Sequence, residues 1–206
     1  MGRADLQLHS DLGDGLSSLE QILDAAERAR LDVIALTDHD DVRGAFTLRD
    51  IAARRNSPVE VVIADAATAE VVEAFGRLLP QLSSSAARLT RESLAEIIGA
   101  PHNTVLLARD PSTGNRIIGT LTLVIFRIPS ARRAWIEDVV VDEVARGRGV
   151  GEALTLAAVE LAKQRGAKTV DLTSRRSRQA AHRLYEKAGF HLRDTSVYRF
   201  GPKPDA

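Results

Sequence analysis

The chain has 206 residues, equal numbers of basic and acidic side chains (28 each) and no cysteine. Zero net charge argues against a global basic field that would draw it to nucleic acid or to a membrane surface, and the missing cysteines exclude disulfides and thiolate metal sites. No run of about 18 apolar residues is present, so we expect neither a membrane span nor a signal peptide, and a cytoplasmic protein.

The first 58 residues differ in charge from the rest, with 11 acids against 7 arginines. A polar run closed by Pro58 separates the two parts, because a helix usually ends before a proline. We therefore expect two domains, 1–57 and 58–206. The first should be a short βαβα unit with strands at 5–9 and 33–36, a helix after a capping box at Ser17 or Ser18, and a helix at 42–55.

Polar clusters follow both strands of this unit, at residues 9–15 and 37–41. The pattern resembles the start of the PHP family (polymerase and histidinol phosphatase) of metal-dependent phosphoesterases. The resemblance implies three metal ligands: His9, Asp14 and His39. Gln7 stands where the family has its first His, and an amide is a poorer ligand than imidazole. The family's later strands are also absent, so we expect a vestigial unit that packs on the second domain or on a second subunit, without a required divalent metal. The same side chains could simply cap turns and helix starts.

In residues 58–206 the apolar pattern predicts an α/β (α+β) fold, a mixed sheet flanked by helices on both faces. Strands are expected at 60–63, 103–109, 116–126, 135–141 and 168–173, helices at 67–79 and 91–98 and from 150 onward, and a polar loop at 80–85. Tyr198 is expected to pack within a terminal strand.

The most informative segment is residues 138–152, where a β-branched run ends in a glycine-rich turn that opens an amphipathic helix. Glycines and larger residues alternate in this turn: Arg146, Gly147, Arg148, Gly149, Val150 and Gly151. Glycines leave backbone N–H groups uncovered at the helix start, which favours an anion site, and two arginines suit a diphosphate.

Arg146, Gly149 and Gly151 match the Arg/Gln-x-x-Gly-x-Gly/Ala loop of the GNAT superfamily of N-acetyltransferases, and residues 181–190 resemble the family's Ala-x-x-x-Tyr-x-x-x-Gly-Phe helix end. The resemblance covers residues 59–201. It implies an acetyl-CoA-dependent N-acetyltransferase that acts on a small primary amine by direct transfer through a tetrahedral intermediate. The diphosphate would bind over residues 146–151, and the pantetheine amides would bind the strand edge at Val139, Val140 and Val141.

Acyl transfer to an amine needs a base for the amine proton and an acid for the leaving thiolate. Adjacent strand residues point to opposite faces, so only one of Glu137 and Asp138 should face the cleft unless a bulge intervenes. Glu137, expected to share a face with Trp135, Val139 and Val141 and to be partly shielded from water, is the candidate base, with Asp138 in reserve. Resemblance to the family makes Tyr185 the candidate acid.

Arg178 stands where many family members have an asparagine that contacts the cofactor arm. With its neighbouring arginines it could hold the cofactor's 3′-phosphate or an anionic substrate, or form a solvated helix start. Two other functions are open: a metal-dependent phosphoesterase, and a non-catalytic acetyl-CoA-binding or oligomerisation module. A homodimer is a candidate assembly.

Overall fold

The structure is a computed structural model, and it describes residues 4–8, 10–11, 15–31, 33–36, 59–83 and 88–201. The helix expected at 42–55 lies outside these residues, as do His9, Asp14 and His39. The chain divides into two compact units, Met1–Thr173 and Ser174–Ala206. Within the described residues, every helix is too short or too polar to cross a membrane.

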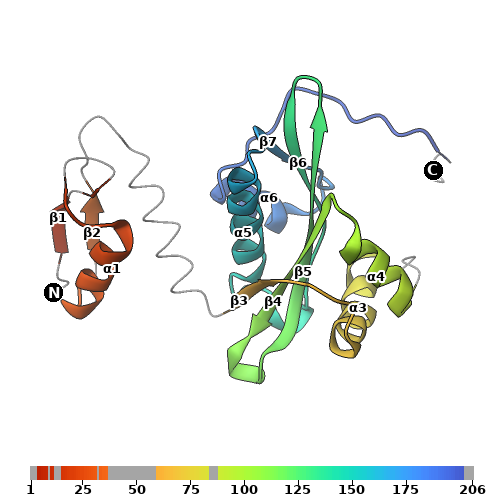
Figure 1. The fold of residues 1–206 in the computed structure, drawn as a ribbon, viewed down its shortest axis with the longest axis horizontal. Helices are drawn as coiled ribbons and strands as arrows, with labels where there is room; N and C mark the ends of the chain where they lie inside the picture. The colour runs from red at the N-terminus through yellow and green to blue at the C-terminus, as the bar shows by residue number, and fades with distance from the viewer. Residues whose placement is uncertain are drawn as a thin grey trace. The chain divides into compact units, whose positions relative to one another are not determined.

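The N-terminal segment forms a β–α–β motif (Figure 1). Its strands β1 (Ala4–Leu8) and β2 (Val33–Leu36) pair in parallel, and α1 (Leu19–Arg28) connects them. Of the two expected capping boxes, the one at Ser18 forms: Gln21 N donates to Ser18 Oγ (3.3 Å), and Ser18 N donates to Gln21 Oε1 (2.9 Å). The apolar side of α1 (Leu19, Ile22 and Leu23) is buried, with Leu8 and Ile34 packed against it.

Residues 59–173 form a five-stranded mixed sheet in the order β3–β4–β5–β6–β7, in which only β6 and β7 are parallel. The strands are β3 (Glu60–Ile63), β4 (Asn103–Asp110), β5 (Arg116–Ile128), β6 (Ala131–Val141) and β7 (Thr169–Leu172). Helices α3 (Ala69–Leu82) and α4 (Arg91–Gly99) cover one face, and α5 (Val150–Gln164) covers the other (Figure 1). The predicted fold class is confirmed.

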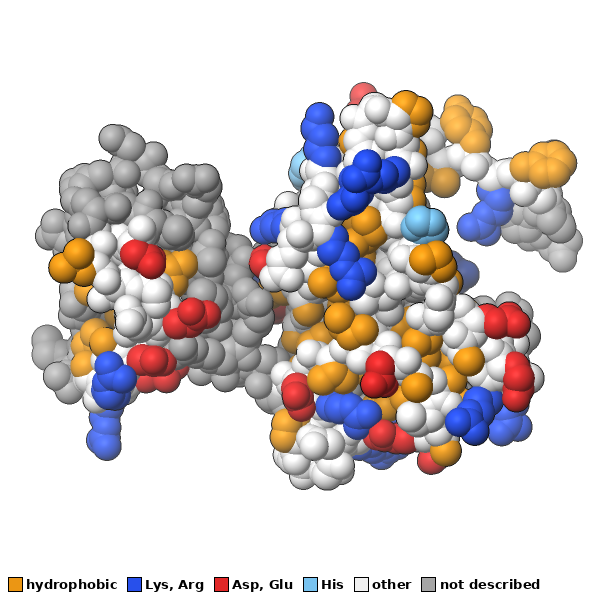
Figure 2. Space-filling view, in the orientation of Figure 1, with side chains coloured by type: hydrophobic (Ala, Val, Ile, Leu, Met, Phe, Trp, Pro, Cys, Tyr) orange, Lys and Arg blue, Asp and Glu red, His pale blue; other side chains and the backbone are white. Residues whose placement is uncertain are grey.

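Alternation along the strands divides the core between these faces. The α3 side contains a cluster of buried side chains: Val71, Phe75, Leu78, Leu94, Val105, Leu107, Ile117 and Val140. On the α5 side Gly119 of β5 lets the helix approach closely, because a Cβ at Gly119 would lie 3.1 Å from both Leu154 and Val150. Figure 2 shows acidic, basic and apolar side chains intermixed on the visible face, as expected for zero net charge.

Helix α3 continues through Pro80 to Leu82, so the prediction of a loop from residue 80 is wrong at its start. Pro80 removes only one N–H, whose acceptor would have been the carbonyl of Gly76, an exposed residue whose carbonyl can bond to water. Ser83 N then closes the last turn on Leu79 O at 3.1 Å.

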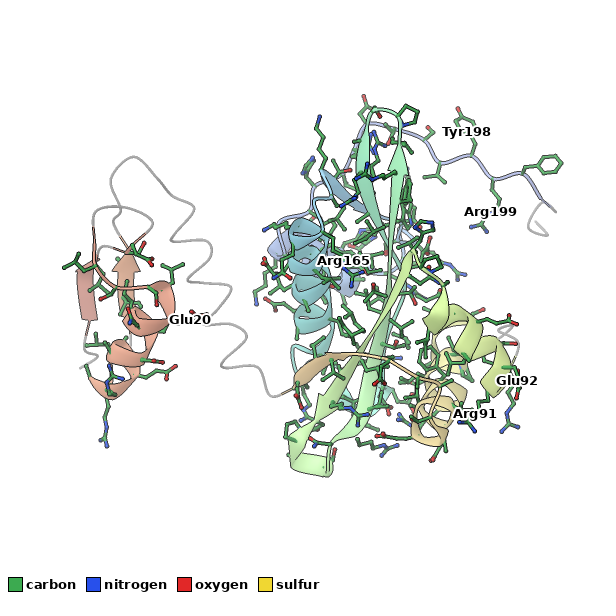
Figure 3. The ribbon with its side chains drawn as sticks, in the orientation of Figure 1. Glu20, Arg91, Glu92, Arg165, Tyr198 and Arg199 are labelled. Atoms are coloured by element: carbon green, nitrogen blue, oxygen red, sulfur yellow. The ribbon has the colours of Figure 1, made fainter. Side chains whose placement is uncertain are left out.

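The second unit contains α6 (Gln179–Lys187) and an extended tail. Tyr185 and Phe190 meet edge to face, with ring centroids 6.0 Å apart. Residues 190–201 form no helix or strand, and Tyr198 is 93% exposed (Figure 3). The expectation that Tyr198 packs within a terminal strand is therefore wrong.

Candidate functional site

The glycine loop joins β6 to α5 within the first unit. After a short turn (Glu143–Ala145), Gly147 and Gly149 adopt φ angles of +76° and +78°, which glycine tolerates best. A Cβ at either glycine would find no atom within 4 Å, so ligand atoms can approach this backbone. Gly149 is the N-cap of α5 and supplies no side-chain acceptor, so the helix start can offer backbone donors to an anion.

Val150 and Gly151, by contrast, anchor the helix to the sheet. Val150 is only 1% exposed, and Gly151 is also buried. Any contact from these two residues to a ligand would therefore come from the backbone. The loop fits a diphosphate because it combines an open backbone, a helix start and arginine side chains.

The two loop arginines have different surroundings. Arg148 Nη2 lies 2.8 Å from Oδ2 of Asp110, a buried residue at the end of β4. Arg146 donates from Nε to Val141 O at 3.3 Å and is exposed. Only Arg148 thus has a carboxylate partner among the contacts that the structure describes for this loop, a distinction that the sequence did not indicate.

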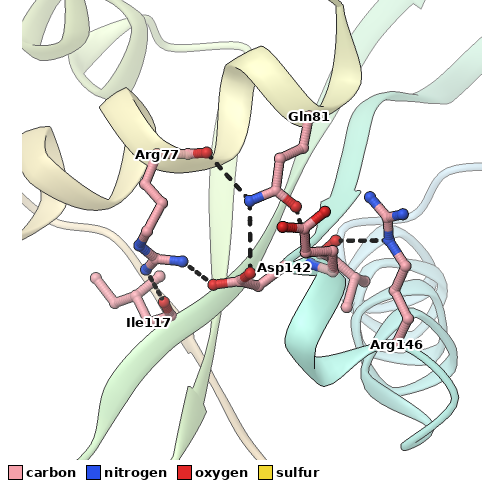
Figure 4. A network of polar contacts seen from close by, with 7 residues as sticks. Arg77, Gln81, Ile117, Asp142 and Arg146 are labelled. Carbon is pink, nitrogen blue, oxygen red and sulfur yellow. Dashed lines mark hydrogen bonds and ion pairs between the residues drawn. The ribbon is translucent and has the colours of Figure 1, made fainter.

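A second set of contacts fixes the chain just before the loop (Figure 4). Asp142, 4% exposed, forms an ion pair with Arg77 of α3 and accepts a longer bond from Gln81 Nε2 at 3.4 Å. Arg77 Nη2 also donates to Ile117 O at 2.6 Å, and Glu143 N donates to Gln81 Oε1 at 2.8 Å. Helix α3, the end of β6 and the middle of the sheet are thereby tied together.

Strand β6 separates from β7 as it approaches the loop. The parallel pairing runs from Arg133 opposite Thr169 to Ile136 opposite Leu172 and ends there. The remaining part of β6, residues 137–141, pairs only with β5 among the described strands. Its other edge can therefore present backbone groups to an extended ligand, as an added strand would.

A β-bulge interrupts β6 at the candidate base. Thr122 pairs with Glu137 and Thr120 with Val140, so one residue of β5 stands opposite two of β6, and Asp138 has φ +50°. The extra residue reverses the alternation of faces. Glu137 therefore shares the α3 face with Trp135 and with the buried Val140.

The bulge corrects two expectations. Val139 and Val141 do not both share the face of Glu137, because Val141 pairs with Gly119 on the α5 side. Shielding of the carboxylate by Trp135 is also absent, since Glu137 and Asp138 are both exposed. Two neighbouring carboxylates are thus available near the end of β6, and the geometry does not choose between them.

Tyr185 and Arg178 belong to the second unit, Ser174–Ala206. Tyr185 lies on α6 and is half-buried; burial raises the pKa of its phenol, and the positive charge of Arg178 opposes this shift. The phenol therefore keeps its proton at neutral pH. Arg178 is the N-cap residue of α6 and makes no side-chain capping bond.

The three predicted metal ligands, His9, Asp14 and His39, lie outside the described part of the chain, so the metal site stays a prediction. The described residues contain no group of three or more His, Asp or Glu side chains that could hold a metal ion.

A mixed sheet whose fourth strand separates from a parallel neighbour beside a glycine loop is the acetyltransferase type of α/β fold. The chain belongs to the acetyltransferase (GNAT) family, whose sequence model matches residues 70–190. It is 42% identical over 106 residues to glucosamine 6-phosphate N-acetyltransferase 1 of Oryza sativa subsp. japonica. This alignment covers 48% of this chain and 63% of that relative.

Solved structures share the fold. An acetyltransferase of Trypanosoma brucei is 26% identical, with a TM-score of 0.56 over 69% of this chain and 99% of its own. The glucosamine-6-phosphate N-acetyltransferase of Arabidopsis thaliana is 21% identical, with a TM-score of 0.55 over 68% of this chain and 98% of its own. The predicted GNAT membership is confirmed, whereas the PHP resemblance of residues 1–57 stays a prediction, since the family match begins at residue 70.

Proposed function

We propose that the protein is an acetyl-CoA-dependent N-acetyltransferase that transfers the acetyl group directly to a small primary amine. The observation that carries the proposal is the combination, in a GNAT chain, of the open glycine loop with the edge of β6 that no described strand pairs with beyond Ile136. GNAT acetyltransferases use acetyl-CoA, which supplies an activated acetyl thioester.

The loop backbone at residues 147–151 and the guanidinium of Arg146 would hold the diphosphate. The edge at Val139, Val140 and Val141 would hold the pantetheine amides, and Arg178 is a candidate for a cofactor phosphate or an anionic substrate. The exposed loop glycines and the end of the β6–β7 pairing at Ile136 support these assignments.

Proton transfers at the amine and at the leaving thiolate complete the reaction. Glu137, or Asp138 beside it in the bulge, takes a proton from the amine, because an alkyl ammonium with a pKa near 10.4 is mostly charged at pH 7. Tyr185 gives the proton of its phenol to the leaving thiolate, and the second proton that the amine nitrogen loses as the amide forms restores the phenol. The raised pKa of Tyr185 supports this role, since the phenol is protonated at the start of each turnover.

The acceptor we put first is an aminosugar phosphate, on the strength of the similarity to the rice enzyme. A basic side chain near the acceptor would be needed for its phosphate, and the arginines at 175, 176, 178 and 183 are candidates. A homodimer and a cytoplasmic location remain predictions.

Thiol release from acetyl-CoA tests the proposal, with glucosamine 6-phosphate, an aminoglycoside, a polyamine and free amino acids as acceptors. We expect amine-dependent release with at least one acceptor, and weaker acetyl-CoA binding in Gly149→Val, whose side chain is strained at φ +78°. Binding without thiol release from any amine would favour the non-catalytic module. No binding in calorimetry would refute the site.

A further inference from the structure

Two buried aspartates make contacts at the glycine loop. Asp142 fixes the chain before the loop through Arg77 and Gln81, and Asp110 reaches the loop itself through Arg148. Asp110 is the last residue of β4 and caps the short turn Pro111–Thr113, yet its other carboxylate oxygen bonds to Arg148, 38 positions away in the sequence. The contact therefore calls for its own physical explanation.

Hydrogen bonds within its own turn hold the carboxylate of Asp110, independently of the glycine loop. Its Oδ1 accepts from Ser112 N (3.0 Å) and from Ser112 Oγ (2.6 Å), while Oδ2 accepts from Arg148 Nη2 (2.8 Å). Asn115 N also donates to the main-chain oxygen of Asp110 at 3.0 Å. The bonds from Ser112 and Arg148 hold the pKa of Asp110 below its ordinary value, so the carboxylate is charged at neutral pH.

The glycine loop has physical reasons to need such a fixed point. It contains two glycines with positive φ and an exposed backbone, and glycine loses more conformational freedom on ordering than any other residue. If the loop became ordered only when its ligand binds, the conformational entropy lost on ordering would weaken ligand binding. Arg148, whose side chain is 40% exposed, connects the middle of the loop to a rigid turn.

We propose that Asp110 is a positioning residue that acts through Arg148 to hold the glycine loop ready for the cofactor diphosphate. The proposal rests on the proposed function, because the ligand of the loop is taken from it. Asp110 itself does not contact the ligand. The bond to Asp110 also restrains Arg148 from turning freely toward the bound anion, so Arg146 and the helix start carry the direct contacts.

The test compares coenzyme A binding in calorimetry among wild type, Asp110→Asn, Arg148→Gln and the double variant. Asparagine keeps an acceptor for Ser112 but faces Arg148 with an NH2 group. We expect each single change to weaken binding about tenfold, and the double change to weaken it no further, because both remove the same contact. In turnover assays the KM for acetyl-CoA should rise while kcat stays within about twofold.

Glu70→Gln is the matched control. This change removes the ion pair between Glu70 and Arg109 (2.7 Å). Arg109 is next to Asp110 in the sequence, but its contact with Glu70 does not involve the loop. The KM of this variant for acetyl-CoA should not change. S-acetylpantetheine, which lacks the diphosphate, should be used equally well by wild type and by the Asp110 variant.

The outcomes separate the two proposals. Wild-type protein that does not bind coenzyme A refutes the proposed function. Wild-type binding with unchanged or tighter binding in Asp110→Asn refutes the positioning role alone, and tighter binding would mean that a released Arg148 serves the diphosphate directly. Should Asp110→Asn fail to fold, Arg148→Gln tests the same contact from its exposed side, and unchanged affinity there has the same meaning.

Discussion

Replacing Gly119 with alanine tests the packing of α5 on the sheet, and with it the foundation of the glycine loop. The new Cβ would lie 3.1 Å from Leu154 Cδ1, from Val150 Cγ1 and from Val140 O. The two side chains can shift by a few tenths of an ångström, but the carbonyl oxygen belongs to β6 and cannot. Overpacking of a core typically costs about 1–3 kcal/mol, against ~0.4–1 kcal/mol gained from a less flexible unfolded chain.

We therefore expect Gly119→Ala to lower the free energy of unfolding by about 1–2 kcal/mol and the melting temperature by about 2–8 °C for a chain of this length. Because Val150 and Leu154 form the first turns of α5, affinity for acetyl-CoA should fall as well. Gly76→Ala is the control: Gly76 is exposed inside α3 with no atom within 4 Å of a Cβ, so the change should stabilise by up to ~1 kcal/mol. Thermal denaturation measures both. A Gly119→Ala protein that melts at or above the wild-type temperature would refute this packing.

Two further predictions concern the proton transfers. Tyr185→Phe should lower kcat with little change in acetyl-CoA affinity. Burial raises the pKa of Tyr185, so the wild-type rate should fall through loss of the phenol proton only as the pH rises above about 10, the ordinary value for a phenol. The variant should not show this fall. Glu137→Gln and Asp138→Asn should each be assayed from about pH 7 to 10. The change that removes the base should slow the reaction at neutral pH, and the rate should recover partly as free amine accumulates. Wild-type rates in both variants would mean that another residue or solvent takes the proton.

Local patterns in the sequence predicted most of the elements of residues 59–173. The strand at 60–63 was predicted with its observed bounds, because a short apolar run follows Pro58 directly. Strand β6 was predicted to start at Trp135 but begins at Ala131. The missed residues include Arg132 and Arg133, which do not read as a strand on their own. They pair with Arg127 and Phe126 of β5, and a hairpin partner is not visible in a local pattern.

The features that define the site's geometry depend on contacts distant in sequence. Arg77 and Asp142 are 65 positions apart, so no periodicity could associate them. Asp110 lies in a segment rich in turn residues and reads as a turn former, which it is, but nothing local indicates Arg148 as its partner. The bulge in β6 leaves no local signal in the sequence, because it places Asp138, rather than a glycine, at positive φ. Glycine spacing predicts a candidate anion site, but not how the loop is held.

The N-terminal segment leads to a last prediction, because its described core is too small to be stable alone. Among the side chains that the structure describes in this segment, the buried apolar ones are Leu19, Ile22, Leu23 and Ala26, with Leu8 and Ile34 beside them, while Leu16 is fully exposed. A two-stranded sheet with so few buried side chains is marginal in water. Stability must then come from the rest of the chain or from a second copy.

Deleting residues 1–57 should therefore change the oligomeric state or cause aggregation, measured by light scattering, while a metal chelator should leave acetyl transfer by the full chain unchanged. The contrary result would be a truncated protein that stays monodisperse, with an unchanged oligomeric state and melting temperature. That outcome would make the segment an independent unit, and a metal that survives dialysis together with manganese-dependent hydrolysis of a phosphate ester would then assign it the phosphoesterase chemistry that His9, Asp14 and His39 suggest.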